Sequence, residues 1–161
     1  MRRVHTYIFT VKAGKEKKTL RDIYDLLFPS DIEVRHRDSG FSGLFFIYTS
    51  IKPNMLTDLL KKYPIRHIIN VKYVLLERNL SMLNKILSNK YFSYETKKIN
   101  ICLCSIKFHG VSRDKKKEIY SFFQRNCKNF LSIKRQCFLE IFEKRLYVSI
   151  KIFNSRKNTK I

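Results

Sequence analysis

Residues 44–49, Leu-Phe-Phe-Ile-Tyr-Thr, form a run of bulky apolar and β-branched side chains that predicts a buried strand. Gly43 precedes this run, and Pro53 follows it at a position where proline can open a helix. Earlier in the chain, residues 5–11 have the same strand-like composition. The segments that connect these two strands decide how they pair.

Two segments flanking the run have the three-to-four-residue apolar spacing of amphipathic helices. The apolar positions are Leu20, Ile23, Tyr24 and Leu27 in the first helix, and Leu56, Leu59, Leu60 and Tyr63 in the second. Residues 32–37 alternate as a strand does, and residues 68–76 read as another strand. The order β-α-β-β-α-β over residues 4–76 predicts a ferredoxin-like domain with a four-stranded antiparallel sheet and two helices on one face.

The second half of the chain predicts a different set of elements. We expect a helix over residues 80–87, a strand over 99–108, a helix opened by Ser112, an extended segment over 130–133 and a hairpin over 136–153. The last strand is expected to bury its even-numbered side chains from Leu146 to Ile152 and to expose the odd-numbered ones. The fold class is therefore α+β, with domains at residues 1–76 and 77–153 and a basic tail at 154–161.

The charge of the chain points to a polyanionic partner. Its 161 residues contain 34 Lys and Arg against 13 Asp and Glu, a net charge of +21. Nucleic acid is the usual reason for such an excess, because binding phosphates releases condensed counterions. Residues 1–76 carry +7 and residues 77–161 carry +14, so we expect the second half to dominate binding. No apolar run approaches the ~20 residues that span a bilayer, and no signal-type segment follows the N-terminus, so a cytoplasmic protein without a membrane partner is expected.

Catalytic and metal signatures are not apparent in the sequence. The four glycines are scattered, so no phosphate-binding glycine loop is predicted. The carboxylates and the four histidines are dispersed, and the four cysteines form no CxxC pair. We expect the cysteines to be buried thiols in a reducing compartment. The sequence thus predicts no catalytic residue, no metal, no cofactor and no enzymatic activity.

The strongest candidate binding site is the segment from Lys107 to Lys117, which predicts a strand end, a glycine loop and a helix start. A helix N-terminus presents free backbone N–H groups and the positive end of the helix dipole, which suit a phosphate. Cations at this end oppose the dipole, and their presence indicates an anion nearby. The predicted RNA-binding residues here are Lys107, His109, Gly110, Ser112, Arg113, Lys116 and Lys117.

Four further residues complete the predicted RNA-binding set. Tyr147 and Lys151 are expected on the exposed face of the last strand, where an aromatic ring among cations can stack a base. Lys134 and Arg135 form a basic pair between the last helix and the hairpin.

The order of elements and several short motifs resemble proteins that join an N-terminal ferredoxin-like domain to a THUMP domain. Residues 105–110 with Ser112-Arg113 are similar to the first THUMP strand and its loop, and residues 138–150 are similar to the closing hairpin. Residues 43–47 with Ser50 and Pro53 resemble stand-alone THUMP adaptors of tRNA cytidine acetylation. The stretch 131–137 departs from the family pattern, because it lacks the family's acidic residues and proline.

The resemblance implies a non-catalytic protein that binds the acceptor stem and 3′ end of tRNA. It further implies that the protein presents the tRNA to a separate modification enzyme such as an acetyltransferase. Two other functions stay open at this point: a basic structural protein bound to ribosomal RNA in the ribosome, and a NusG-like transcription factor, which the first half also resembles. A weaker alternative is a nuclease or transferase whose site is assembled only in the fold.

Overall fold

The structure, a computed structural model, describes residues 3–88, 91–94, 97–127 and 137–155. The chain divides into two compact units: unit 1 comprises residues 1–74 and 151–161, and unit 2 comprises residues 75–150. The fold class is α+β, as predicted. The first boundary lies two residues from the predicted one, and residues 151–155 are grouped with unit 1.

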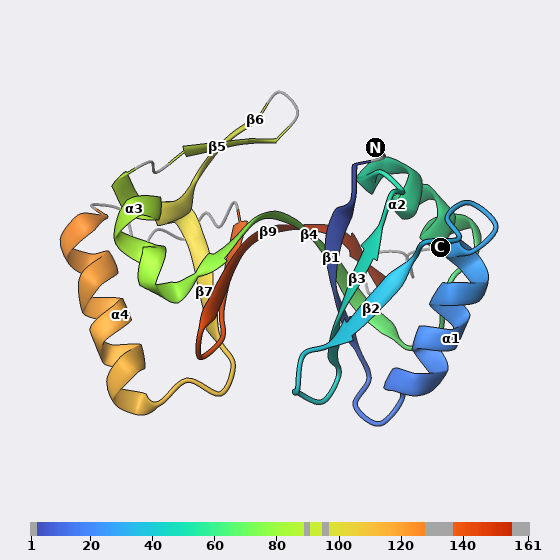
Figure 1. The fold of residues 1–161 in the computed structure, drawn as a ribbon, viewed down its shortest axis with the longest axis horizontal. Helices are drawn as coiled ribbons and strands as arrows, with labels where there is room; N and C mark the ends of the chain where they lie inside the picture. Colours follow the sequence, from blue (N-terminus) through green and yellow to red (C-terminus); the bar gives the residue numbers. More distant parts are fainter. Residues whose placement is uncertain (1–2, 89–90, 95–96, 128–136, 156–161) are drawn as a thin grey trace. The chain divides into compact units, whose positions relative to one another are not determined.

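Unit 1 has the predicted order of elements. They are β1 (His5–Val11), α1 (Glu16–Leu27), β2 (Arg35–Asp38), β3 (Leu44–Thr49), α2 (Pro53–Lys62) and the first part of β4 (Ile68–Asn79). β1 pairs antiparallel with β3 on one side and β4 on the other, and β2 pairs antiparallel with β3. Both helices pack on one face of these strands (Figure 1).

The two helices of unit 1 begin and end where the sequence indicates. Pro53 occupies the first turn of α2, where its missing N–H costs nothing. In α1, Thr19, Ile23 and Leu27 are buried and recur at helical spacing, so one stripe of the helix faces the sheet. The loop before β3 is held by Gly43, whose φ is +74° and whose added Cβ would lie 2.7 Å from the carbonyl oxygen of Val11. Glycine is therefore required at this close approach of two chain segments.

Unit 2 contains the remaining elements. In chain order they are the end of β4, η1 (Leu80–Met82), α3 (Leu83–Ser88), β5 (Tyr91–Tyr94), β6 (Lys97–Asn100), η2 (Ile101–Leu103), β7 (Cys104–Phe108), α4 (Arg113–Asn126), β8 (Cys137–Ile141) and most of β9 (Arg145–Asn154). β7 pairs parallel with β8, and β8 pairs antiparallel with β9. β5 and β6 form a two-stranded antiparallel ribbon. Among the described strands, the main hydrogen-bonding order is β2-β3-β1-β4-β9-β8-β7.

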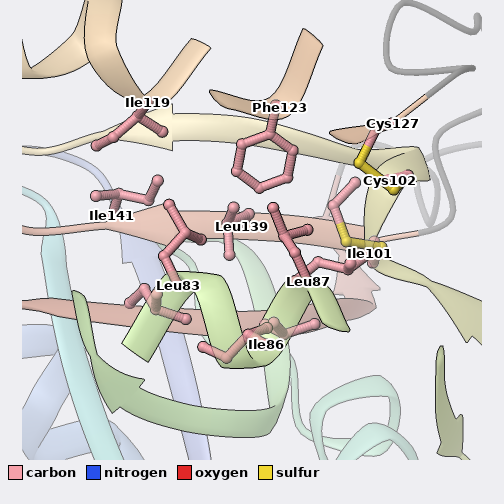
Figure 2. Close-up of a cluster of buried hydrophobic side chains, with 14 of the residues drawn as sticks. Leu83, Ile86, Leu87, Ile101, Cys102, Ile119, Phe123, Cys127, Leu139 and Ile141 are labelled. Carbon is pink, nitrogen blue, oxygen red and sulfur yellow. A yellow bond between two sulfur atoms is a disulfide. The ribbon is translucent and has the colours of Figure 1, made fainter. Parts of the chain in front are cut away.

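The core of unit 2 is a cluster of apolar side chains from its helices and strands. Figure 2 shows the labelled members Leu83, Ile86, Leu87, Ile101, Ile119, Phe123, Leu139 and Ile141 facing one another. The helical members recur at three- and four-residue spacing, and Leu139 and Ile141 lie on one face of β8. Removing such side chains from water drives folding at roughly 25 cal/mol per Å² of apolar surface.

The cysteines do not behave as predicted. Cys102 is bonded to Cys127, and Cys104 is bonded to Cys137, so the described chain contains no free thiol. The expectation of buried thiols is therefore wrong. Cys104 and Cys137 are register partners on the parallel strands β7 and β8, and their Cα atoms lie 4.3 Å apart. This strand pairing could not be read from the sequence spacing.

The strand expected over residues 99–108 is also interrupted. The 3₁₀ turn η2 separates β6 from β7, and the Asn100 side-chain oxygen accepts a hydrogen bond from the backbone N–H of Cys102 (2.9 Å). An asparagine side chain that bonds the backbone two residues later favours a turn over a continuous strand. The extended segment expected at 130–133 lies outside the described residues. Within the residues that the structure describes, no helix is long and apolar enough to span a membrane.

Candidate functional site

The loop between β7 and α4 is anchored at both ends. At its start, the backbone N–H of His109 donates to the carbonyl oxygen of Ile141 (2.9 Å), which continues the pairing with β8. Gly110 is exposed and has a φ of +65°, a conformation that turns the chain away from the strand. Val111 then enters the core of unit 2. The sequence therefore places the helix start next to the strand end, as predicted.

Ser112 caps α4. Its hydroxyl accepts a hydrogen bond from the backbone N–H of Lys115 (3.3 Å), and its carbonyl accepts the first helical bond from Lys116 (3.0 Å). By helix geometry, the N–H groups of Arg113 and Asp114 have no partner within the helix. The predicted role of Ser112 as a cap is confirmed, and two backbone donors point out of the helix beside the exposed Gly110.

The cations of the first turns of α4 differ in their partners. Lys115 forms an ion pair with Glu118, with a distance of 2.9 Å between Nζ and Oε2. In the described part of the chain, the side chains of Arg113 and Lys117 form no ion pair or hydrogen bond, and both are exposed. Lys116 is half-buried, with its Nζ 5.8 Å from the ring centroid of Phe108. Arg113 and Lys117 are thus the cations of α4 available to a phosphate.

An exposed aromatic side chain lies on the same face of the helix and was missed at the sequence level. Tyr120 is 40% exposed, and its ring meets that of Phe108 edge to face at 5.2 Å. Because side chains three and four residues apart share a helix face, Arg113, Lys116, Lys117 and Tyr120 form one surface. We call these four residues the α4 basic face. The spacing 113, 116, 117, 120 was the signal that could have found Tyr120.

Lys107 and His109 do not join the α4 basic face. Successive side chains of a strand point to opposite faces, and Ile106 and Phe108 pack on the core that α4 covers. Lys107 therefore lies on the other face of the sheet, with its Nζ 5.1 Å from the ring centroid of Phe138. The structure separates the predicted group into a helix part and a sheet part.

His109 has a specific partner that the sequence did not indicate. Its Nε2 lies 2.5 Å from Oε2 of Glu140, a carboxylate that is only 1% exposed. The imidazole also stacks on the ring of Phe142, with 4.6 Å between centroids. A buried carboxylate that is hydrogen-bonded to an imidazole fixes the orientation of the ring. This pair holds His109 in place, at a separation of 31 residues along the chain.

Tyr147 is a correction to the predicted site. The ring is 1% exposed, and its hydroxyl donates to Oε1 of Glu77 (3.1 Å), which also accepts from the Arg145 guanidinium. A buried ring cannot stack a base from solution. Leu146, Val148 and Ser149 are buried as well, so both faces of β9 are covered here and the expected alternation fails.

Three other predicted residues belong to other parts of the chain. Lys151 is exposed but belongs to unit 1. Lys134 and Arg135 lie outside the described residues. The assignment of residues 151–161 to unit 1 also changes the charge balance: unit 1 has 18 basic and 7 acidic residues, or +11, and unit 2 has 16 and 6, or +10. The two units thus carry nearly equal net charge, and total charge alone does not single out unit 2 as the binding unit.

The described residues contain no group of three or more His, Cys, Asp or Glu side chains that could hold a metal ion. The His109–Glu140 pair supplies two such side chains, and the four described cysteines are engaged in disulfides. The groups at the α4 basic face suit anion binding. They are the backbone N–H groups of Arg113 and Asp114, the side-chain cations of Arg113 and Lys117, and the ring of Tyr120.

Comparison with known proteins gives matches only among solved structures, because no protein-family model and no curated protein matches the chain. One match is the crystal structure of a predicted N6-adenine-specific DNA methylase from Listeria monocytogenes: it is 9% identical, covers 92% of this chain and 40% of the methylase, and has a TM-score of 0.48. Another is a proposed methyltransferase complexed with SAH: it is 10% identical, covers 94% of this chain and 42% of the other, and has a TM-score of 0.43. This chain thus spans about two fifths of the length of these two proteins.

These matches contradict the function predicted from the sequence. Both are described as proteins that transfer methyl groups, whereas a non-catalytic adaptor that presents tRNA was expected. The prediction of a non-catalytic tRNA adaptor is therefore corrected, because the solved structures that match this chain are described as methyl-transferring proteins. The resemblance to THUMP proteins stays a prediction, since no family model matches the chain.

Proposed function

We propose that this chain binds nucleic acid and that the α4 basic face contacts the sugar–phosphate chain. The observation that carries the proposal is the arrangement of Arg113 and Lys117 beside the free amides at the start of α4. Side-chain cations and a helix N-terminus attract the same anion for independent electrostatic reasons. A net charge of +21 adds a long-range attraction for any polyanion.

Tyr120 distinguishes nucleic acid from a simple anion. Its ring is 40% exposed and lies one helical turn from Lys117 and Lys116. Single-stranded nucleic acid is held by cations that follow the backbone together with aromatic rings on which bases stack. The α4 basic face combines both features within about two helical turns. The neighbouring Gly110 exposes the backbone at the helix start, where no side chain obstructs a phosphate.

The test is the salt dependence of binding to a fluorescently labelled hairpin RNA with a single-stranded end. The double variant Arg113→Ala/Lys117→Ala should flatten the slope of log K against log salt by roughly one to two units, because each phosphate contact contributes a slope of about 0.7–0.9. Both side chains are exposed, so the variant should keep the wild-type melting temperature within the small range of surface substitutions.

Lys115→Ala is the matched control, because Lys115 occupies the same helical turn but is already paired with Glu118. It removes one positive charge without removing a free cation, so its slope should stay close to that of the wild type. Equal slopes for the wild type, the control and the double variant would exclude the α4 basic face as the contact surface.

A further inference from the structure

Unit 1 contains a groove that the proposed function does not use. Its volume is about 850 Å³, within the roughly 300–1,000 Å³ range of small-molecule sites. One wall is the outer face of α1, which contributes Lys18, Asp22 and Asp25, and the other is the segment from the end of α2 to the start of β4. All of its lining residues belong to unit 1, so the groove is independent of the α4 basic face.

The groove combines an apolar lining with an accessible aromatic ring. Leu26, Leu59 and Ile65 contribute apolar side chains to its walls. Tyr63 follows the last residue of α2 and is 52% exposed, so its ring is accessible from the groove. The Nζ of Lys62 lies over one face of the Tyr63 ring, 5.3 Å from its centroid.

Charged groups of both signs line the groove without neutralising one another. In the described part of the chain, the side chains of Asp22, Asp25 and Arg66 form no hydrogen bond or ion pair. Exposed charged side chains are commonly solvated, but here acceptors and donors converge on one concave surface. The acceptors are on α1, and Lys62 and Arg66 are on the opposite wall.

His67 adds a buried polar group at the same place. The residue is 8% exposed and lines the groove, and its Nδ1 has no hydrogen-bond partner among the described residues. A buried polar atom without a partner costs free energy and calls for an explanation such as a bound ligand. Burial lowers the pKa of His67, and the charges of Arg66 and Lys18 lower it further.

We propose that this groove binds a nucleoside phosphate, with the base stacked on Tyr63 and the phosphate held by Lys62 and Arg66. The carboxylates of Asp22 and Asp25 can accept hydrogen bonds from ribose hydroxyls or from an exocyclic amino group. A purely anionic ligand would be repelled by both carboxylates, and a purely apolar ligand would bury the charged side chains of both walls without partners. A ligand with a ring, hydroxyl donors and an anionic group offers a partner to the tyrosine, the carboxylates and the cations.

The experiment is a titration of the full chain with AMP, followed by the chemical shifts of its backbone amides. Tyr63→Ala and Lys62→Gln should each weaken AMP binding by about fivefold or more, the loss expected for a stacked base or a phosphate contact. Lys61→Gln is the matched control, because Lys61 is exposed and adjacent but does not line the groove. Tyr63→Phe keeps the ring and should bind AMP as the wild type does, which separates loss of stacking from loss of fold.

A free nucleotide and the terminal nucleotide of a strand carry the same chemistry, and a 5′-phosphorylated trinucleotide distinguishes them. Saturable AMP binding that depends on Tyr63 and Lys62 supports a free nucleotide as ligand. If only the binding of the trinucleotide depends on these two residues, the result supports the end of a strand as ligand. If neither probe responds to Tyr63→Ala and Lys62→Gln, or if Lys61→Gln has the same effect, the proposal is overturned. Arg113→Ala/Lys117→Ala should leave AMP binding unchanged, so the two sites fail or succeed separately.

Discussion

The imidazole of His109 and the buried carboxylate of Glu140 are hydrogen-bonded at 2.5 Å across the parallel strands β7 and β8. His109 opens the loop that leads to α4, and Glu140 is 1% exposed inside the sheet. The pair therefore connects the position of the loop to the packing of the strands. Its consequences for stability can be measured directly.

We expect His109→Leu to destabilise unit 2 by about 1–3 kcal/mol, because it removes a hydrogen-bond partner from a buried carboxylate. Urea unfolding followed by circular dichroism measures the change. Glu118→Gln breaks an exposed pair with Lys115 and should cost at most about 1 kcal/mol. A loss for His109→Leu no larger than for this control would show that the buried pair does not stabilise the loop.

Tyr120→Ala should weaken binding to single-stranded RNA by about 1–3 kcal/mol, the cost of losing one stacked base. The slope against salt should not change, because the ring carries no charge. Tyr120→Phe is the control, since it keeps the ring and its contact with Phe108. Fluorescence anisotropy at several salt concentrations gives both quantities. A change in slope without a change in affinity would contradict a stacking role.

The disulfides should contribute strongly to the stability of unit 2. Cys102–Cys127 and Cys104–Cys137 close segments with sequence separations of 25 and 33 residues. The loss of chain entropy in the unfolded state predicts about 3–4 kcal/mol for each crosslink of this length. Thiol alkylation and mass spectrometry of the native protein should find no free cysteine, and a reducing agent should lower the melting temperature. Four alkylated thiols in the native protein would contradict the pairing.

Glu16 predicts a specific loss of stability in acid. Its Oε1 accepts hydrogen bonds from the backbone N–H of Gly43 (2.6 Å) and from the Ser42 hydroxyl (3.1 Å). Hydrogen bonds from its own backbone N–H and from those of Gly43 and Gly14 lower the pKa of Glu16 from 4.5 to about 2. Because the folded-state pKa is the lower one, the contribution is present above pH 4.5 and is lost as the pH falls towards 2.

The measurement compares the melting temperature of the wild type with that of Glu16→Gln from neutral pH down to about pH 2. The difference between the two proteins should be largest above pH 4.5 and should shrink as the carboxylate is protonated. Asp58→Asn, an exposed carboxylate on α2, should show a smaller difference at every pH. A difference for Glu16→Gln that stays constant with pH would contradict the hydrogen-bonded carboxylate.

Most of the secondary structure followed from local sequence, and the reasons are visible at particular residues. The run 44–49 is apolar on both faces and became β3, and Pro53 opened α2 as its fixed φ favours. Ser112 capped α4 because its hydroxyl can reach an amide three residues later. The prediction of one strand over 99–108 was wrong because the Asn100 side chain accepts a hydrogen bond from the backbone N–H of Cys102, a competition that hydrophobic periodicity does not register.

The candidate site could be predicted only where its residues are close in sequence. Arg113, Lys116 and Lys117 lie within two helical turns, so a helix start was enough to bring them together. The prediction that Tyr147 is exposed was wrong because the burial of a strand face depends on what packs over it. The alternation of side chains alone assumes that one face is open to solvent. Glu140 was missed because the pairing of β7 with β8 brings it to His109 from 31 residues away.

By itself, the sequence determined the α+β class, the β-α-β-β-α-β order of unit 1, the capped start of α4 and the total charge of +21. These features depend on backbone propensities and hydrogen bonds between residues close in sequence, or on composition alone. Only the tertiary structure decided the disulfide pairs, the His109–Glu140 contact, the burial of Tyr147 and the return of the C-terminal residues to unit 1. Each of these depends on which elements distant in sequence pack together, and the free energy of packing the whole chain decides that.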